Sequence, residues 1–222
     1  LGRDLLAVEH AADDPDRFVE PAEPLPVAGA ELDAVGLVLE RGGVTELPFI
    51  WFWPEGAAGC AMMTHDIEGS RGAAFCPELM ALDDAHGIKS AFQVVPDAPW
   101  SSRVSTKQLV DELKRRGFEV NVHDLTHDGQ LFRSREKFLR HATTINARGR
   151  EFGSRGFRSG AMYRRQGWLA ALDISYDMSV PNVAHLEPQA GGCCTVMPYF
   201  LGHVLELPLT ATQDYTLFHI LG

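Results

Sequence analysis

Short apolar runs alternate with longer amphipathic segments from about residue 59 to the end of the chain. The short runs are typical of buried strands, whereas apolar residues spaced three or four apart indicate helices. Strands are predicted near residues 59–64, 89–95, 118–122, 156–157, 174–177 and 204–207. Helices are predicted near residues 77–86, 105–116, 134–148 and 166–172. Strands that alternate with helices in this way favour βαβ units and a parallel sheet, an α/β fold.

Polar residues stand at or just beyond the ends of four predicted strands. They are Asp66, His123, Arg158 and Asp177. The carboxyl ends of parallel strands meet at one edge of a sheet, and α/β proteins build their sites there. We therefore expect these four side chains to share one pocket.

Residues 1–48 differ from the rest of the chain. They contain a proline-rich passage at 21–26 and several turn-forming residues, with weak periodicity. This pattern predicts an N-terminal extension or accessory layer over residues 1–48. Residues 49–222 are then one α/β domain, which is a normal size for a single core.

The balance of charge excludes some classes of partner. The chain has 222 residues with a formal net charge of −10, and its 20 basic residues are scattered, which argues against binding to nucleic acid. No apolar run approaches the roughly 18 residues of a membrane span, so no membrane insertion is expected. The chain opens with Leu1 and shows no basic segment followed by an apolar one, so a signal peptide is absent or already removed. Localisation and oligomeric state stay open.

The segment HDLTH at 123–127 places two histidines four residues apart. Neutral imidazoles together with a carboxylate suit Zn²⁺ or a similar transition metal, although the spacing alone also fits solvated loop histidines. Asp66 and Glu68 lie two residues apart, so on an extended segment they point to the same side. One carboxylate can then bind metal while the other stays free as a general base, unless both simply face water.

The segments THDIEG at 64–69 and HDLTH at 123–127 resemble, in order and spacing, the first two motifs of the NodB-homology family of polysaccharide deacetylases. The likeness is to the branch whose first motif reads T-H-D-x-E, and it covers roughly residues 58–222. It implies a distorted parallel (β/α) barrel of the seven-stranded deacetylase type. We expect this chain to end before the last segment of that barrel.

The resemblance also implies roles for single residues. Asp66 is similar to the catalytic base of the family, and Arg158 to the arginine that orients that base and balances its charge. Asp177 is similar to the acid of the fourth motif. The metal ligands implied are Glu68, His123 and His127. The ion expected is one divalent metal, zinc first, with Co, Mn, Ni or Fe as alternatives.

Two features depart from the family pattern. The third motif usually continues Arg-x-Pro with an aromatic nearby, whereas Ser159-Gly160-Ala161 follows Arg158 here, and Tyr163 is the first aromatic. Tyr163 is therefore the expected substrate-binding residue. The histidine that serves the family as general acid has no clear counterpart, because neither His203 nor His219 follows a predicted strand end.

The function implied is that of a metal-dependent hydrolase that removes N-acetyl groups from an amino-sugar polymer or oligosaccharide. Two alternatives remain. One is another C–N amide hydrolase on the same fold, acting on a substrate such as a cyclic ureide, since the same chemistry can attack any planar carbonyl. The other is a non-catalytic carbohydrate-binding barrel that lacks the acid histidine.

Overall fold

The computed structural model describes residues 41–43, 53–182, 189, 191–193, 195–211 and 216–220. Most of the predicted N-terminal extension, 1–48, lies outside these residues. The strands are β1 (Thr64–Ile67), β2 (Ala91–Val94), β3 (Glu119–His123), β4 (Gly156–Arg158), β5 (Tyr176–Asp177), β6 (Tyr199–Leu201) and β7 (Val204–Glu206). The longer helices are α2 (Ser70–Ala85), α3 (Arg103–Arg115) and α4 (Arg135–Phe152). Short helical turns are η1 (Pro54–Gly56), η2 (Gly160–Met162), η3 (Gln166–Ala171) and η4 (Thr216–Ile220).

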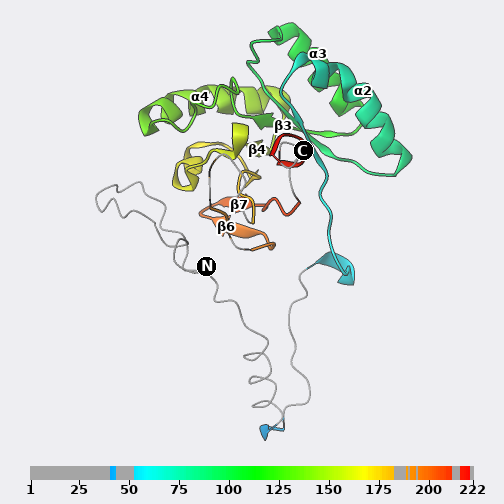
Figure 1. The fold of residues 1–222 in the computed structure, drawn as a ribbon, viewed down its shortest axis with the longest axis vertical. Coiled ribbons are helices and arrows are strands. Elements are labelled where there is room, and N and C mark those ends of the chain that lie inside the picture. The colour runs from blue at the N-terminus through cyan, green and yellow to red at the C-terminus, as the bar shows by residue number, and fades with distance from the viewer. Residues whose placement is uncertain are drawn as a thin grey trace.

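Among the described residues the strands form one seven-stranded sheet in the order β1-β2-β3-β4-β5-β7-β6. Neighbouring strands are parallel except for β6, which runs antiparallel to β7. The predicted α/β class is therefore confirmed, with β1 and β6 at the two ends of the strand order. In Figure 1 helices α2, α3 and α4 lie above the strands, so one layer of helices covers this side of the sheet.

The first strand and helix begin at different residues from those predicted. The strand was expected at 59–64, but β1 spans Thr64–Ile67 and pairs with Ala91–Val94 of β2. Helix α2 begins at Ser70, so Pro77, expected near its start, lies inside it. Proline costs a helix one hydrogen bond. In the turn before the proline, Cys76 is buried and its thiol donates to the Gly72 carbonyl.

The ends of the next two helices also differ from prediction. Helix α3 is capped by Ser102, whose Oγ accepts from the Ser105 N–H at 3.1 Å, three residues before the predicted start at 105. Helix α4 continues past Gly149 and ends at Gly153, which has a φ of 69°. Glycine adopts this left-handed conformation without steric cost, so it ends a helix well.

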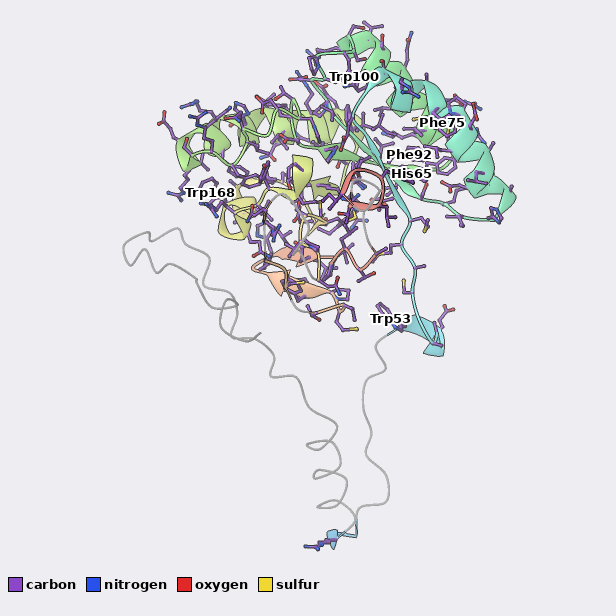
Figure 2. The ribbon with its side chains drawn as sticks, viewed as in Figure 1. Trp53, His65, Phe75, Phe92, Trp100 and Trp168 are labelled. Carbon is purple, nitrogen blue, oxygen red and sulfur yellow. The ribbon has the colours of Figure 1, made fainter. Side chains whose placement is uncertain are left out.

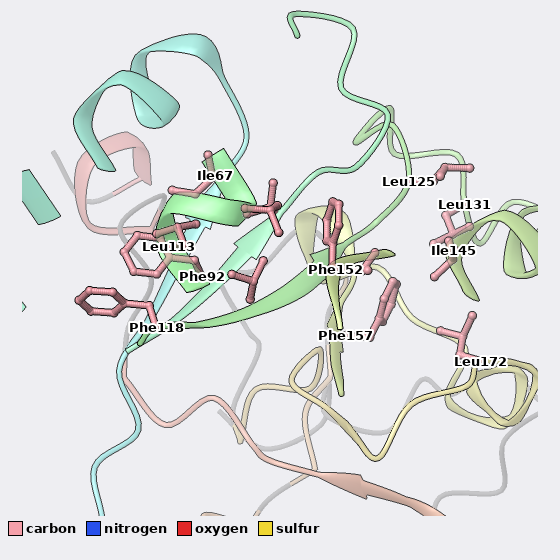
Figure 3. Packing of buried hydrophobic residues seen from close by; sticks show 14 of the residues in the cluster. Ile67, Phe92, Leu113, Phe118, Leu125, Leu131, Ile145, Phe152, Phe157 and Leu172 are labelled. Carbon is pink, nitrogen blue, oxygen red and sulfur yellow. The ribbon is translucent and has the colours of Figure 1, made fainter. Parts of the chain in front are cut away.

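The core lies between this helical layer and the sheet. Figure 3 shows Phe92, Leu113 and Phe118 packed together, with Phe157 and Ile145 farther along the same cluster. Figure 2 shows His65 beside Phe92, and their ring centroids are 5.0 Å apart. His65 therefore points into the core. Asp66, the next residue, points to the opposite face of the sheet, because side chains alternate along a strand.

None of the helices in the described part of the chain combines the length and apolar character needed to cross a lipid bilayer.

Candidate metal centre and its surroundings

Two strand ends and one loop bring three ligand-bearing residues together. Glu68 directly follows β1, His123 is the last residue of β3, and His127 lies in the loop after β3. Glu68 Oε1 lies 3.0 Å from His123 Nε2 and 3.1 Å from His127 Nε2. One ligand atom from each residue falls within 4.8 Å of the others. The structure thus groups the three residues predicted from the sequence as metal ligands.

The hydrogen bonds of His123 fit a metal at this point. Its Nδ1 lies 3.0 Å from the carbonyl oxygen of Arg158. Because a carbonyl can only accept, Nδ1 carries the hydrogen, and in the neutral ring Nε2 is then a bare lone pair. That lone pair faces a carboxylate oxygen, which is repulsive unless a cation or a proton lies between them. Metal-bound histidines commonly donate their other N–H to a backbone carbonyl in this way.

The electrostatics of Glu68 and His127 also fit a bound cation. The nearness of His123 and then of His127 holds the pKa of Glu68 well below its usual range. Glu68 in turn raises the pKa of His127. Although it is close to Glu68, His127 Nε2 is buried and has no hydrogen-bond partner of suitable geometry among the described residues. A divalent cation would satisfy that nitrogen and the carboxylate together.

Asp66 stands beside this group, held by an arginine. Arg158 Nη1 donates to Asp66 Oδ1 at 2.8 Å, and the arginine side chain is buried. The other carboxylate oxygen, Oδ2, lies 3.9 Å from His123 Nε2. Asp66 therefore keeps one oxygen fixed by Arg158 and presents the other toward the predicted metal ligands.

The loops that carry these residues are tightly packed. Asp124 and His127 have φ values of 56° and 57°, a region that non-glycine residues rarely occupy and that is found at functional sites. A Cβ added to Gly160 would lie 2.6 Å from Asp124 Oδ2 and 2.9 Å from His127 Cδ2. The departure from Arg-x-Pro thus has a physical reason, because only glycine leaves room for the His127 ring here.

Asp177 occupies a different position from the other predicted residues. It is fully buried, and its two oxygens accept from Ser179 Oγ at 2.8 Å and from the Ser179 N–H at 3.1 Å. No hydrogen bond or ion pair in the described part of the chain joins it to Asp66. It lies near Arg158 but is fully buried, whereas the side chain of Asp66 is 30% exposed, so Asp177 does not line the open part of the site.

Sequence reasoning missed the partner of Asp177, which is Glu206. The two residues are opposite each other in the pairing of β5 with β7, and both are fully buried. Burial and the neighbouring Asp177 raise the pKa of Glu206 well above its usual value, and burial also raises the pKa of Asp177. Two adjacent buried carboxyl groups share one proton. The available signal was an acid inside the apolar run at 205–209.

The histidines considered for the general acid lie elsewhere or cannot be described. His203 is exposed in the turn between β6 and β7, at the start of β7. Since β7 is parallel to β5, that turn is at the opposite edge of the sheet from the ends of β3 and β4. The side chain of His219 lies outside the described residues.

Comparisons with known proteins bear on the fold. No family model matches the chain, and no curated protein matches it. The crystal structure of a "putative polysaccharide deacetylase" from Mycobacterium smegmatis is similar with a TM-score of 0.52 at 16% identity, over 71% of this chain and 61% of that one. The Xyl-CE4 domain of a multidomain xylanase from the hindgut metagenome of Trinervitermes trinervoides gives a TM-score of 0.41 at 15% identity, over 54% of this chain and 56% of that one, too distant to add to the argument. The fold of this chain, with its seven-stranded and mostly parallel sheet, is therefore similar to that of a polysaccharide deacetylase, as the resemblance predicted.

Proposed function

We propose that this chain is a metal-dependent hydrolase that removes N-acetyl groups from an amino-sugar polymer or oligosaccharide. The observation that carries the proposal is the pairing of Asp66 with Arg158 directly beside the group formed by Glu68, His123 and His127. A ligand group alone fits a structural metal. A separate carboxylate held next to it supplies the base that hydrolysis requires.

Glu68, His123 and His127 would hold the ion. Three protein ligands are the number found at catalytic zinc sites, which leave a position open for water or substrate. A divalent ion so held would supply Lewis-acid polarisation of an acetamide carbonyl and would make water more acidic. Zinc suits two imidazoles and a carboxylate, and Co, Mn, Ni or Fe are the alternatives.

The remaining steps fall to side chains of this chain. Asp66 Oδ2 would take the proton from the attacking water, while Oδ1 stays bonded to Arg158. Arg158 orients Asp66 and balances its charge. Asp177, one of the buried pair with Glu206, lies near Arg158 and would help to hold its guanidinium in place. Acetate and a free amino sugar would be the products.

Replacing Asp66 with Asn in the 222-residue chain tests the proposal. Acetate release from chito-oligosaccharides should fall by about 100-fold or more, while zinc content measured by atomic emission stays the same. Asp111→Asn, which changes an exposed acid on α3, is the matched control and should retain full activity. Activity of Asp66→Asn close to that of the unaltered chain would remove Asp66 from the mechanism.

Measurements of acetate release, of ring opening and of zinc content separate the two alternatives. Ring opening of a cyclic ureide without acetate release would identify another amide hydrolase on this fold. Stoichiometric zinc with no turnover of either substrate would favour a non-catalytic carbohydrate-binding protein.

A further inference from the structure

Next to the proposed metal centre lies a pocket of about 350 Å³ with an unusual lining. Its walls combine arginines, aromatic rings and amides. The lining residues are Gly129, Gln130, Phe132, Arg133, Tyr163, Arg164, Arg165 and Gln189. No lining residue is acidic, although the chain as a whole has a formal net charge of −10. Positive charge is therefore concentrated in one concave part of an acidic protein.

The pocket adjoins the metal centre through two segments. Gly129 follows the predicted ligand His127 by two residues, and a Cβ at Gly129 would lie 3.6 Å from the ring of Tyr163. Tyr163 itself follows η2, whose first residue, Gly160, packs against the ring of His127. An oligosaccharide bound at the proposed metal centre would therefore lie beside this pocket.

The arginines of the pocket have no carboxylate partner among the described residues, unlike several on the helices. Arg115 pairs with Glu112 on α3, and Arg140 with Glu136 on α4. By contrast, the buried Arg164 donates to the Met162 and Gly191 carbonyls. The exposed Arg133 donates to Gln130 Oε1 at 3.0 Å. Neutral acceptors hold the guanidinium groups of Arg133 and Arg164, and no carboxylate among the described residues forms an ion pair with any of the three arginines.

One aromatic wall of the pocket packs against the core. Phe132 stacks on Phe138, with centroids 5.1 Å apart, and on Trp168, with centroids 6.1 Å apart. These contacts join the pocket wall to the core. Aromatic rings offer flat apolar surfaces on which the faces of sugar rings pack, while guanidinium groups bind carboxylate and phosphate oxygens in pairs.

We propose that this pocket binds an acidic sugar of the substrate, one that carries a carboxylate or a phosphate group, beside the N-acetylated sugar at the metal centre. Arg133 and Arg165 contact the anion, and Phe132 and Tyr163 contact the ring. This inference rests on the proposed deacetylase function for its link to catalysis, but binding to the pocket can be measured without turnover.

The test uses the Asp66→Asn form of the full 222-residue chain, so that bound oligosaccharides are not consumed. Titration calorimetry compares three tetrasaccharides of equal length. They are a neutral N-acetylglucosamine oligomer, an oligomer alternating N-acetylglucosamine with glucuronate, and the neutral oligomer carrying one phosphate. One of the acidic oligomers should bind about 10-fold or more tightly than the neutral one, and the tighter of the two identifies the group.

Substitution of the arginines shows whether the preference for an acidic oligomer arises in this pocket. Arg133→Gln and Arg165→Gln in the same background should each remove most of the preference for the acidic oligomer and leave binding of the neutral oligomer unchanged. Arg115→Gln, an equal change of charge at an exposed position on α3, should keep the preference. Circular dichroism confirms that each variant is folded.

The outcomes separate this inference from the proposed function. Equal affinity for the neutral and both acidic oligomers overturns it, whether or not acetate is released. A preference that survives both pocket substitutions also overturns it, because the anion is then bound elsewhere. A preference lost with Arg133 and Arg165, but without acetate release by the unaltered chain, supports the pocket and refutes the deacetylase.

Discussion

Arg158 links the proposed base to a proposed metal ligand through two different parts of the same residue. Its guanidinium donates to Asp66, and its carbonyl oxygen accepts from both His123 Nδ1 and the Asp124 N–H. The backbone of β4 therefore sets the ring of His123 while the side chain sets Asp66. The relative placement of base and ligands depends on one residue in the centre of the sheet.

The buried acid pair leads to a prediction about stability and pH. The pKa of Glu206 in the folded chain is raised above the ordinary value of 4.5, so the fold favours its protonated form. Stability from this group is complete below pH 4.5 and is lost as the pH rises through the folded-state pKa. Glu206→Gln keeps a neutral donor beside Asp177, so its melting temperature should fall less between pH 5 and pH 8 than that of the unaltered chain.

The titratable groups near this pair are Arg158, Arg164 and Tyr199, with the thiol of Cys193. They are the same in the variant, so the comparison isolates Glu206. Glu78→Gln, an exposed change on α2, should leave the pH dependence as it is. If the melting temperatures of Glu206→Gln and of the unaltered chain fall equally between pH 5 and pH 8, Glu206 is ionised in the folded chain.

At the scale of elements, helix α4 follows the loop that carries the proposed ligand His127 and packs its buried face into the core. It begins at Arg135, after the loop that carries His127, and its N-cap Ser134 accepts from the Lys137 N–H at 3.2 Å. Its buried face contains Phe138, Ala142 and Ile145, spaced three or four residues apart. The stability of this one helix should therefore influence the order of the site.

Two glycines of α4 should respond in opposite directions to alanine. Gly149 lies inside the helix, and a Cβ there meets only ordinary contacts at 3.9 Å or more, so Gly149→Ala should stabilise by about 0.5–1 kcal/mol. Gly153 has a φ of 69°, and a Cβ there would lie 3.0 Å from Lys114 Nζ, so Gly153→Ala should destabilise by about 1 kcal/mol. Urea unfolding of both variants checks the signs. Equal effects would contradict the assigned helix end.

Over the whole molecule, the alternation of strands and helices was predictable because β1, β2 and β3 are each followed by a long helix, α2, α3 and α4. The convergence of Asp66, His123 and Arg158 followed from their places at strand ends. Strand β6 was missed, because only Tyr199–Leu201 pair and the next turn is set by Gly202, with a φ of 63°. The pair of Asp177 and Glu206 was missed, and so was the arginine-lined pocket. Both bring together residues that are far apart in the sequence, and no local pattern predicts such contacts.

Metal binding should be visible in the stability of the whole chain. The proposed ligands come from the end of β1 and from the end of β3 with its following loop, and they meet only in the folded state. Zinc at about 100 times its dissociation constant should therefore stabilise the fold by about 2.7 kcal/mol, which is about 5–10 °C in melting temperature for a chain of this size. Calorimetric melting with and without zinc measures the shift, and a chelator should reverse it.

The shift should depend on Glu68, because removing its charge takes away the only carboxylate among the three proposed ligands. Glu68→Gln should lose most of the stabilisation by zinc, and the loss should appear whatever the substrate of the enzyme is. Glu136→Gln removes an equal charge from an exposed position on α4 and should keep the full shift. A full shift in Glu68→Gln would place the ion at another site, and the assignment of His123 and His127 as ligands would fall with it.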